Sequence, residues 1–399
     1  MAEITSIDYS KRNLEEIPFN IINVKINWLI ISDNKIKNIP DNIQNLTALT
    51  RIAANDNRIQ HISPMITKLK DLNWIDLTRN RLRELPSGFH TLQKVTGLGL
   101  SENDFEKIPE CIFKMVNIKK FGFFSNRVKS IPPDIRHLKN LVKIDLSNNQ
   151  LTSLPEEFCE LTNLNWLNLS NNKLKKLPNN LNKLINLEEL GLGMNQLEEL
   201  PDLSNLNKLR ILPVFRNKIK TVSTSLSNLR SIEKLDFSDN MITEFPSHVL
   251  ENHTLRYLNL KSNKIKMIPS ELIEGVKSKI TMLDLSDNLL PHIPLKFFKI
   301  FPNISTIRIN DNPYVYSKNK VPAQPSLLET CYSKCLNMKY NAPPWISNVF
   351  KRVMVCDVCD KYYVKSPYVV YCLSSINEGF TFVVEKMLCS SKCYKSETK

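Results

Sequence analysis

Asparagine recurs at a fixed interval through most of this 399-residue chain, each time inside the same pattern of aliphatic residues. Residues 141–163 show the pattern L-x-x-L-x-L-x-x-N-x-L-x-x-L-P most clearly, and Asn126, Asn149 and Asn172 are 23 residues apart. The asparagine position is filled by Asn34, Asn57, Asn80, Asn103, Asn126, Asn149, Asn172, Asn195, Asn217, Asn240, Asn263, Asn288 and Asn312. Such a period predicts a solenoid in which each repeat supplies one short strand to a shared core. We expect each asparagine amide to bond the turn backbone of its own and of the next repeat, because these groups would otherwise be buried unpaired.

The pattern, with Leu-Pro after its last strand-side leucine, resembles the intracellular leucine-rich repeat proteins related to Ras-pathway scaffolds. The expected fold is therefore a leucine-rich repeat solenoid of the α/β class over residues 1–314, with about 14 repeats whose parallel strands form a concave sheet. The first repeat has Arg12 in the asparagine position, which is expected of a terminal repeat because one of its sides faces water.

The sequence indicates an intracellular protein, in the cytoplasm, the nucleus or both. It has neither an apolar run of signal-peptide type nor a stretch long enough to span a membrane. Of its nine cysteines, only Cys111 and Cys159 lie in the repeats, whereas extracellular arrays usually carry disulfide-rich caps. The other cysteines lie within residues 331–393, which marks a different module.

A net charge of +14 permits an acidic or nucleic-acid partner. The lysines of the array, however, fall largely just after the asparagine position, which is typical of a solvated rim. A nucleic-acid binder using the basic tail with Tyr362, Tyr363 and Tyr368 would show a steep salt dependence. We do not expect nucleic acid as the partner, because the lysines form no continuous inner stripe.

Two zones of the inward strand positions depart from the polar residues expected of a solvated inner face. The first holds Trp74, Gly97, Gly99, Gly122 and Phe124, and the second holds Gly191, Gly193, Met194, Arg210, Ile211, Pro213, Phe215 and Arg216. Exposed aromatics and arginine beside a bare backbone are typical of protein-binding hot spots. We predict that Trp74, Phe124, Met194, Arg210, Phe215 and Arg216 bind a protein substrate. The alternative is that Trp74 and Trp166 lie flat across neighbouring strands as ordinary sheet packing.

Beyond Pro313 the repeat rhythm stops. Residues 315–325 are expected to form a linker, and Ser326 with Glu329 forms a capping box that predicts a short amphipathic helix over Ser326–Tyr340. Taken alone, that helix is typical of a lid over the last repeat.

The same helix is similar to the elongin-binding box of ubiquitin ligase receptors. The residues that carry this similarity are Ser326, Leu327, Cys331 and Cys335. Shortly after them, Ala342, Pro343, Ile346 and Phe350 resemble the cullin-2 box. The resemblance implies that segment 326–352 binds elongin B/C and cullin-2.

Residues 353–399 form the cysteine-rich module. The motif CDVC contains Cys356 and Cys359, and CSSKC contains Cys389 and Cys393, with a segment rich in strand formers between them. Two such pairs predict four thiolates on one structural zinc ion in a zinc-ribbon-like module. Cys372 is a possible substitute ligand, and disulfides are the alternative.

The full arrangement resembles a small family of animal leucine-rich repeat proteins that act as substrate receptors of elongin BC/cullin-2 ubiquitin ligases. The function implied is a non-catalytic substrate-recognition subunit, an expectation that agrees with the absence of any catalytic motif in the sequence. The alternative is a signalling scaffold that binds a small GTPase or a phosphatase through the same concave zones.

Overall fold

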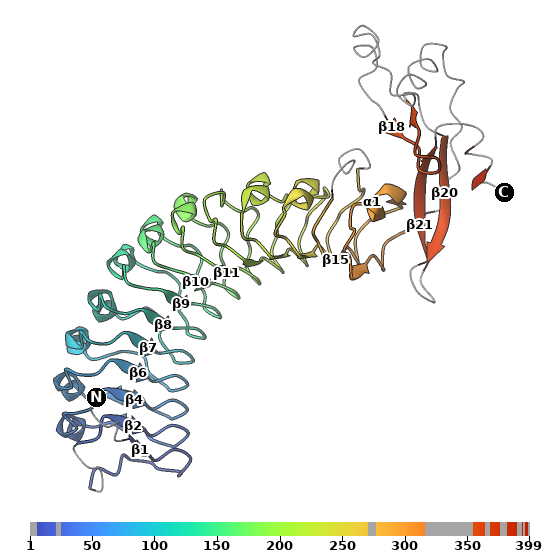
Figure 1. Ribbon diagram of the computed structural model, residues 1–399. Helices are drawn as coiled ribbons and strands as arrows, with labels where there is room; N and C mark the ends of the chain where they lie inside the picture. Colours follow the sequence, from blue (N-terminus) through green and yellow to red (C-terminus); the bar gives the residue numbers. More distant parts are fainter. Residues whose placement is uncertain are drawn as a thin grey trace. The chain divides into compact units, whose positions relative to one another are not determined.

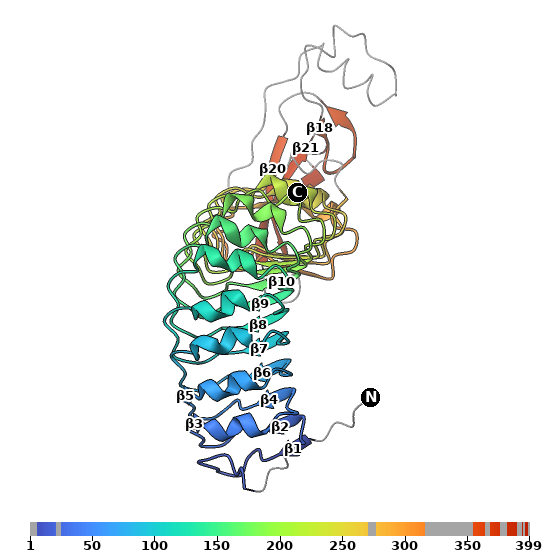
Figure 2. The same cartoon turned by 90° about the vertical axis from the view of Figure 1, so that its left-hand side faces the viewer.

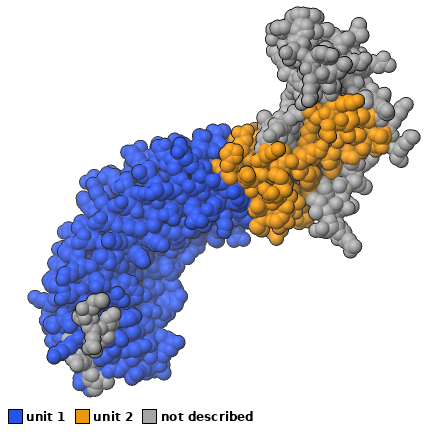
Figure 3. Space-filling view, viewed as in Figure 1, with its two compact units in different colours: residues 1–241, 254–258 blue, residues 242–253, 259–399 orange. Residues whose placement is uncertain are grey.

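The computed structural model describes residues 6–20, 25–269, 277–315, 354–363, 368–375, 381–388, 393, 396 and 397. The chain divides into two compact units, which Figure 3 colours separately. Unit 1 comprises Met1–Met241 and Thr254–Leu258, and unit 2 comprises Ile242–His253 and Asn259–Lys399.

A 14-stranded sheet runs through the repeats in the order of the sequence, which confirms the predicted leucine-rich repeat solenoid. Its strands are β1 (Ser6–Asp8), β2 (Trp28–Ile30), β4 (Arg51–Ala53), β6 (Trp74–Asp76), β7 (Gly97–Gly99), β8 (Lys120–Gly122), β9 (Lys143–Asp145), β10 (Trp166–Asn168), β11 (Glu189–Gly191), β12 (Ile211–Pro213), β13 (Lys234–Asp236), β14 (Tyr257–Asn259), β15 (Met282–Asp284) and β17 (Thr306–Arg308). From β2 to β15 the middle residue of each of these strands is buried, because alternate side chains of a strand point to opposite faces.

The return segments carry short 3-10 helices. They are η1 (Asp41–Asn45), η2 (Pro64–Lys68), η3 (Ser87–Thr91), η4 (Glu110–Lys114), η5 (Pro133–His137), η6 (Glu156–Glu160), η7 (Asn179–Lys183), η8 (Thr224–Asn228) and η9 (Ser247–Glu251). A proline that follows a large apolar residue directly precedes most of these helices, as Pro155 after Leu154 precedes η6, because its fixed φ suits the entry to a helical turn. In unit 1 the 3-10 helices stack in a column beside the strands (Figure 1), and β3 (Asn38–Ile39) and β5 (His61–Ile62) form a separate ladder beyond them (Figure 2).

The asparagine ladder holds successive repeats together. The Nδ2 group of Asn149 donates to the carbonyls of Leu146 and Ser147 in its own turn and to that of Phe123, at 3.0–3.2 Å. Its Oδ1 accepts the Val128 N–H at 3.1 Å. The expectation of a bond to the next repeat was therefore wrong. The Asn149 amide instead bonds Phe123 and Val128 of the preceding repeat, because the turn of that repeat lies beside it.

One repeat of unit 1 departs from the others. The interval from Asn195 to Asn217 is 22 residues, and residues 192–210, all of which the structure describes, contain no 3-10 helix. The strand pairs from β1 to β11 match three residues each, whereas β11 and β12 match only Glu189 with Ile211. Pro213 explains the short ladder because it has no N–H to donate to its neighbour.

Unit 2 joins the last repeats to the cysteine-rich module. It contains α1 (Leu295–Lys299), β16 (Ile293–Pro294), the hairpin of β18 (Met354–Val355) and β19 (Tyr362–Tyr363), and the hairpin of β20 (Tyr368–Ser375) and β21 (Thr381–Leu388). Strand β21 pairs in parallel with β16, so that a three-stranded sheet runs in the order β16-β21-β20.

Most of the segment between the solenoid and this module lies outside the described residues, including the predicted linker 315–325 beyond Val315 and the predicted helix. The proposed division at residues 314, 325 and 352 therefore stays a prediction. None of the helices in the described ranges is long and apolar enough to cross a membrane.

Candidate functional site

The candidate binding surface is the open face of the sheet in unit 1, the side opposite the core. The first and third residues of each strand lie on it, together with the two residues that precede each ladder asparagine. The residue directly before the asparagine has positive φ in every full repeat, for example 53° at Asn148 and 57° at Met194. The open face is therefore a regular grid with one row for each of these positions.

Glycines in this grid accommodate side chains from neighbouring repeats. A Cβ atom on Gly97 would lie 2.5 Å from Cδ1 of Trp74, so the indole ring lies across Gly97. A Cβ on Gly99 would lie 2.7 Å from Oδ1 of Asp76. The glycine floor beside Trp74 is thus covered rather than bare, and this geometry is the flat sheet packing that the sequence left as an alternative. A role of Trp74 in binding stays a prediction.

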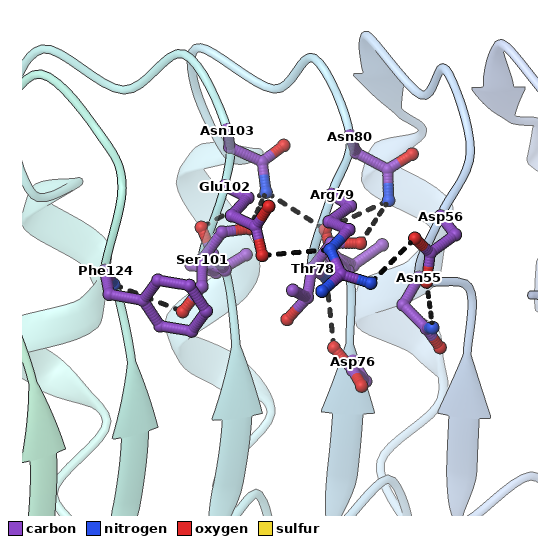
Figure 4. A network of polar contacts seen from close by, with 12 residues as sticks. Asn55, Asp56, Asp76, Thr78, Arg79, Asn80, Ser101, Glu102, Asn103 and Phe124 are labelled. Carbon is purple, nitrogen blue, oxygen red and sulfur yellow. Dashed lines mark hydrogen bonds and ion pairs between the residues drawn. The ribbon is translucent and has the colours of Figure 1, made fainter. Parts of the chain in front are cut away.

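Phe124 lies partly exposed on the open face, beside a network of charged and polar side chains (Figure 4). Its backbone N–H donates to Oγ of Ser101 at 3.2 Å, and Ser101 also lies 3.1 Å from the position of a Cβ on Gly122. In the neighbouring row, directly before the ladder asparagines, Arg79 bridges Asp56 and Glu102 at 3.1 and 2.9 Å. Phe124 is therefore a partly exposed apolar group of the first zone beside a polar network, and Trp74 is exposed to a similar degree.

The second zone is an apolar patch over β11 and β12. The ring of Phe215 fills the space above Gly193, where a Cβ would lie 2.4 Å from Cε1 of the ring. Met194 stands 38% exposed beside it, and Ile211 and Pro213 are partly exposed. We call Met194, Ile211, Pro213 and Phe215 the apolar patch.

The two arginines of the second zone are held by neighbouring acids. Arg210 makes two bonds to Glu233, at 3.0 and 3.2 Å, and this hydrogen bonding lowers the pKa of the Glu233 carboxyl. Arg216 lies 3.6 Å from Asp239. Both arginines therefore form a charged rim at the sides of the apolar patch.

Two lysines of the open face were not among the sequence-predicted site residues. Lys120 and Lys143 are the first residues of β8 and β9 and are matched with each other in the sheet. Both are exposed, and neither has an ion pair or side-chain hydrogen bond within the described residues. Their 23-residue spacing in the sequence could have identified this adjacent pair of like charges.

Three cysteines of the C-terminal module lie together. The Sγ atoms of Cys356, Cys359 and Cys393 are all within 4.8 Å of one another, close enough for one metal ion. The backbone folds tightly around them: Asp360 has a φ of 54° directly after Cys359, and its N–H donates to the Cys356 carbonyl at 3.1 Å. The fourth predicted ligand, Cys389, lies outside the described residues, and the side chain of Cys372 is likewise not described.

The module is packed onto the end of the repeats within unit 2. Val384 and Leu388 of β21 are 2% and 0% exposed, and β21 lies against α1, whose Phe297 is fully buried. His292, next to β16, forms an ion pair with Glu385 of β21 at 2.8 Å. These contacts fix the cysteine-bearing segment to the last repeats.

The comparisons with known proteins agree with this architecture. A sequence model of the leucine-rich repeat region matches residues 110–286. A leucine-rich repeat protein of Leptospira interrogans is 30% identical with a TM-score of 0.71, over 76% of this chain and 77% of that one. This chain belongs to the leucine-rich repeat family.

Other solved structures support the fold of this leucine-rich repeat protein. A TDR receptor is 28% identical with a TM-score of 0.66, and the match covers 78% of this chain and 56% of the receptor. An internalin of Listeria monocytogenes, at 21% identity and a TM-score of 0.67 over 76% of this chain and 86% of that one, shows the fold alone. No curated protein matches the sequence.

The partner motifs of this leucine-rich repeat protein are not tested by the structure. The elongin-binding residues Ser326, Leu327, Cys331 and Cys335 and the cullin-binding residues Ala342, Pro343, Ile346 and Phe350 all lie outside the described residues. Their roles stay predictions from the sequence.

Proposed function

We propose that this leucine-rich repeat protein is a non-catalytic scaffold that captures a protein partner on the open face of unit 1. The observation that carries the proposal is the apolar patch, where Met194 is 38% exposed beside Phe215, and Ile211 and Pro213 are partly exposed. The ion pairs of Arg210 and Arg216 stand at its sides. An apolar centre with a polar rim is the arrangement of a protein-binding hot spot.

The more specific role that we propose is substrate recognition for an elongin BC/cullin-2 ubiquitin ligase. The order of the two motifs within residues 326–352 supports this role, because it matches the order in the receptors that the chain resembles. The packing of β21 also supports it. Val384, which is 2% exposed and matched with Ile293 of β16, covers the end of the repeats near α1, which is the task that a capping helix would otherwise have.

In this proposal the cysteine-rich module holds a structural zinc ion. Cys356, Cys359 and Cys393 fit such a site because their sulfur atoms converge within 4.8 Å, and thiolates around a tetrahedral zinc ion are about 3.8 Å apart. Cys389 would complete the ligand set. Four protein ligands leave no open position for a substrate, so the ion would stabilise the module rather than catalyse a reaction.

The test of the ligase role is affinity purification of the full chain from cells, with elongin B, elongin C and cullin-2 quantified by mass spectrometry. The test variant is Leu327→Asp with Cys331→Asp. The control is Leu289→Asp, which places an aspartate on a leucine of unit 2 that is 44% exposed and outside the motif. Circular dichroism and thermal unfolding establish that each variant is folded.

We expect to recover all three proteins with the wild type and with the control. We expect to recover none of them with the Leu327→Asp, Cys331→Asp variant. If none of the three is recovered with the wild type, the ligase role is wrong. The scaffold that binds a small GTPase or a phosphatase is then the remaining interpretation, and the same mass spectra would show such a partner.

A further inference from the structure

The open face carries an uncompensated positive charge at β8 and β9. Lys120 and Lys143 are exposed residues matched across adjacent strands, and neither has an acidic partner within the described residues. The neighbouring Lys119 is also exposed. Like charges opposite each other destabilise a sheet, so this arrangement has a cost to folding.

Several other cations of unit 1 are compensated. Arg79 bonds Asp56 and Glu102, and Arg210 bonds Glu233. Arg51 stacks over the ring of Trp28, with 5.7 Å between its Cζ and the ring centroid. Lys120 and Lys143 differ in being like charges matched on adjacent strands, and an anionic group on a ligand would complete the pair in the same manner.

Ile211, at one end of the apolar patch, lies in the same row of the open face as the lysine pair. Three strand steps lead from Lys143 on β9 through β10 and β11 to Ile211 on β12. At about 4.8 Å per strand this separation is about 14 Å. An extended chain covers it with about four residues.

We propose that the open face binds an extended peptide segment of a partner protein that carries Asp, Glu or a phosphorylated residue about four positions away from a large apolar residue. The anionic group pairs with Lys120 and Lys143, and the apolar side chain rests on Ile211 and Pro213. This inference rests on the proposed protein-binding function and specifies the chemistry of the partner.

The charges around the lysine pair favour a peptide over nucleic acid. Asp76 and Asp145 lie on the same face, on β6 and β9, and would repel the continuous phosphates of a nucleic acid strand. A peptide carries its negative charge on one side chain, and its neutral residues can lie next to these carboxylates. The lysine pair therefore suits a single anionic side chain rather than a polyanion.

The experiment is selection of random 12-residue peptides by phage display on the full chain. Three proteins are compared: the wild type, Lys120→Glu with Lys143→Glu, and a control, Lys173→Glu with Lys175→Glu. The control changes the net charge equally, on exposed lysines of the rim that follows Asn172. A second test variant, Ile211→Asp, removes the apolar anchor.

On the wild type and the control, we expect peptides with an acidic residue about four positions from a large apolar one. On Lys120→Glu with Lys143→Glu, the selected peptides should carry Lys or Arg in place of the acid. A synthetic peptide from the wild-type selection should bind this variant about tenfold or more weakly, and should bind the wild type more weakly as salt is raised.

Other outcomes separate the inference from the proposed function. Peptides without an acidic preference, or with a preference unchanged in the lysine variant, would overturn the inference and leave protein binding intact. If neither peptides nor cellular proteins bind any version of the open face, the proposed function itself is wrong. Salt-sensitive binding of single-stranded oligonucleotides that is lost in the lysine variant would replace the peptide with nucleic acid.

Discussion

The ladder asparagines act by supplying four hydrogen bonds to a turn that water does not reach. Asn149 is 7% exposed, and its amide uses both the donor and the acceptor ends. The residue before it has a φ of 53°, a conformation that costs a non-glycine residue free energy. The amide bonds offset that cost, so a turn of this shape forms without glycine. Met194 and Arg216 stand at the equivalent position, which projects them onto the open face.

Asn149→Ala should destabilise the repeats around it by about 2–4 kcal/mol, because it leaves buried N–H and C=O groups unpaired. Urea denaturation followed by circular dichroism measures the change. The control is Thr152→Ala, at an exposed position three residues later in the same turn. Equal midpoints for the two variants would contradict the role assigned to the amide.

Gly97→Ala should destabilise the protein by about 1–3 kcal/mol, because the added methyl group collides with the ring of Trp74 and forces it to move. The control is Gly88→Ala in η3, where the nearest atom to the new Cβ would be 3.4 Å away in ordinary contact. Thermal unfolding and tryptophan emission report the two changes. A Gly97 variant that unfolds and emits as the wild type does would show that Trp74 does not lie across Gly97.

At the scale of elements, basic pairs after the asparagine recur in every second repeat of unit 1. They are Lys35 and Lys37, Arg81 and Arg83, Arg127 and Lys129, Lys173 and Lys175, and Lys218 and Lys220. Adjacent strands are about 4.8 Å apart, so this alternation separates like charges. It also places Asp104 beside Arg127, at 2.6 Å, and Glu198 beside Lys220, at 3.2 Å. The pattern favours the solvated-rim interpretation of these residues.

The junction of β11 and β12 is the irregular element of unit 1, with its shortened repeat and its single matched residue pair. Pro213→Val should restore the missing donor and stabilise the protein by about 1 kcal/mol. Native-state hydrogen exchange should show slower exchange in β11 and β12. Ala53→Val is the control, because it adds valine at the same strand position of β4, where the ladder is complete. If both variants change stability equally, Pro213 is not the cause of the irregularity.

At the scale of the whole molecule, unit 2 depends on the convergence of cysteines that are distant in the sequence. We expect one zinc ion per chain by atomic emission spectroscopy, and loss of the ion with a lower melting temperature in Cys356→Ser. Cys111→Ser is the control, because Cys111 is a buried thiol in η4 whose pKa is raised to about 11 by burial. A zinc content that is unchanged in Cys356→Ser would exclude this cysteine as a ligand.

The sequence alone determined the solenoid, because the ladder bonds and the core leucines repeat at a period that a linear pattern records. It also determined that the CDVC and CSSKC motifs come together, which is confirmed for Cys393 because this residue lies next to Cys356 and Cys359. The tertiary structure decided what the pattern could not. Side chains lean across the grid in a direction set by the space above each glycine, so Trp74 covers Gly97 and Phe215 covers Gly193. The sequence did not predict that the β20–β21 hairpin pairs with β16, because non-local strand pairing leaves no mark at a fixed spacing in the sequence.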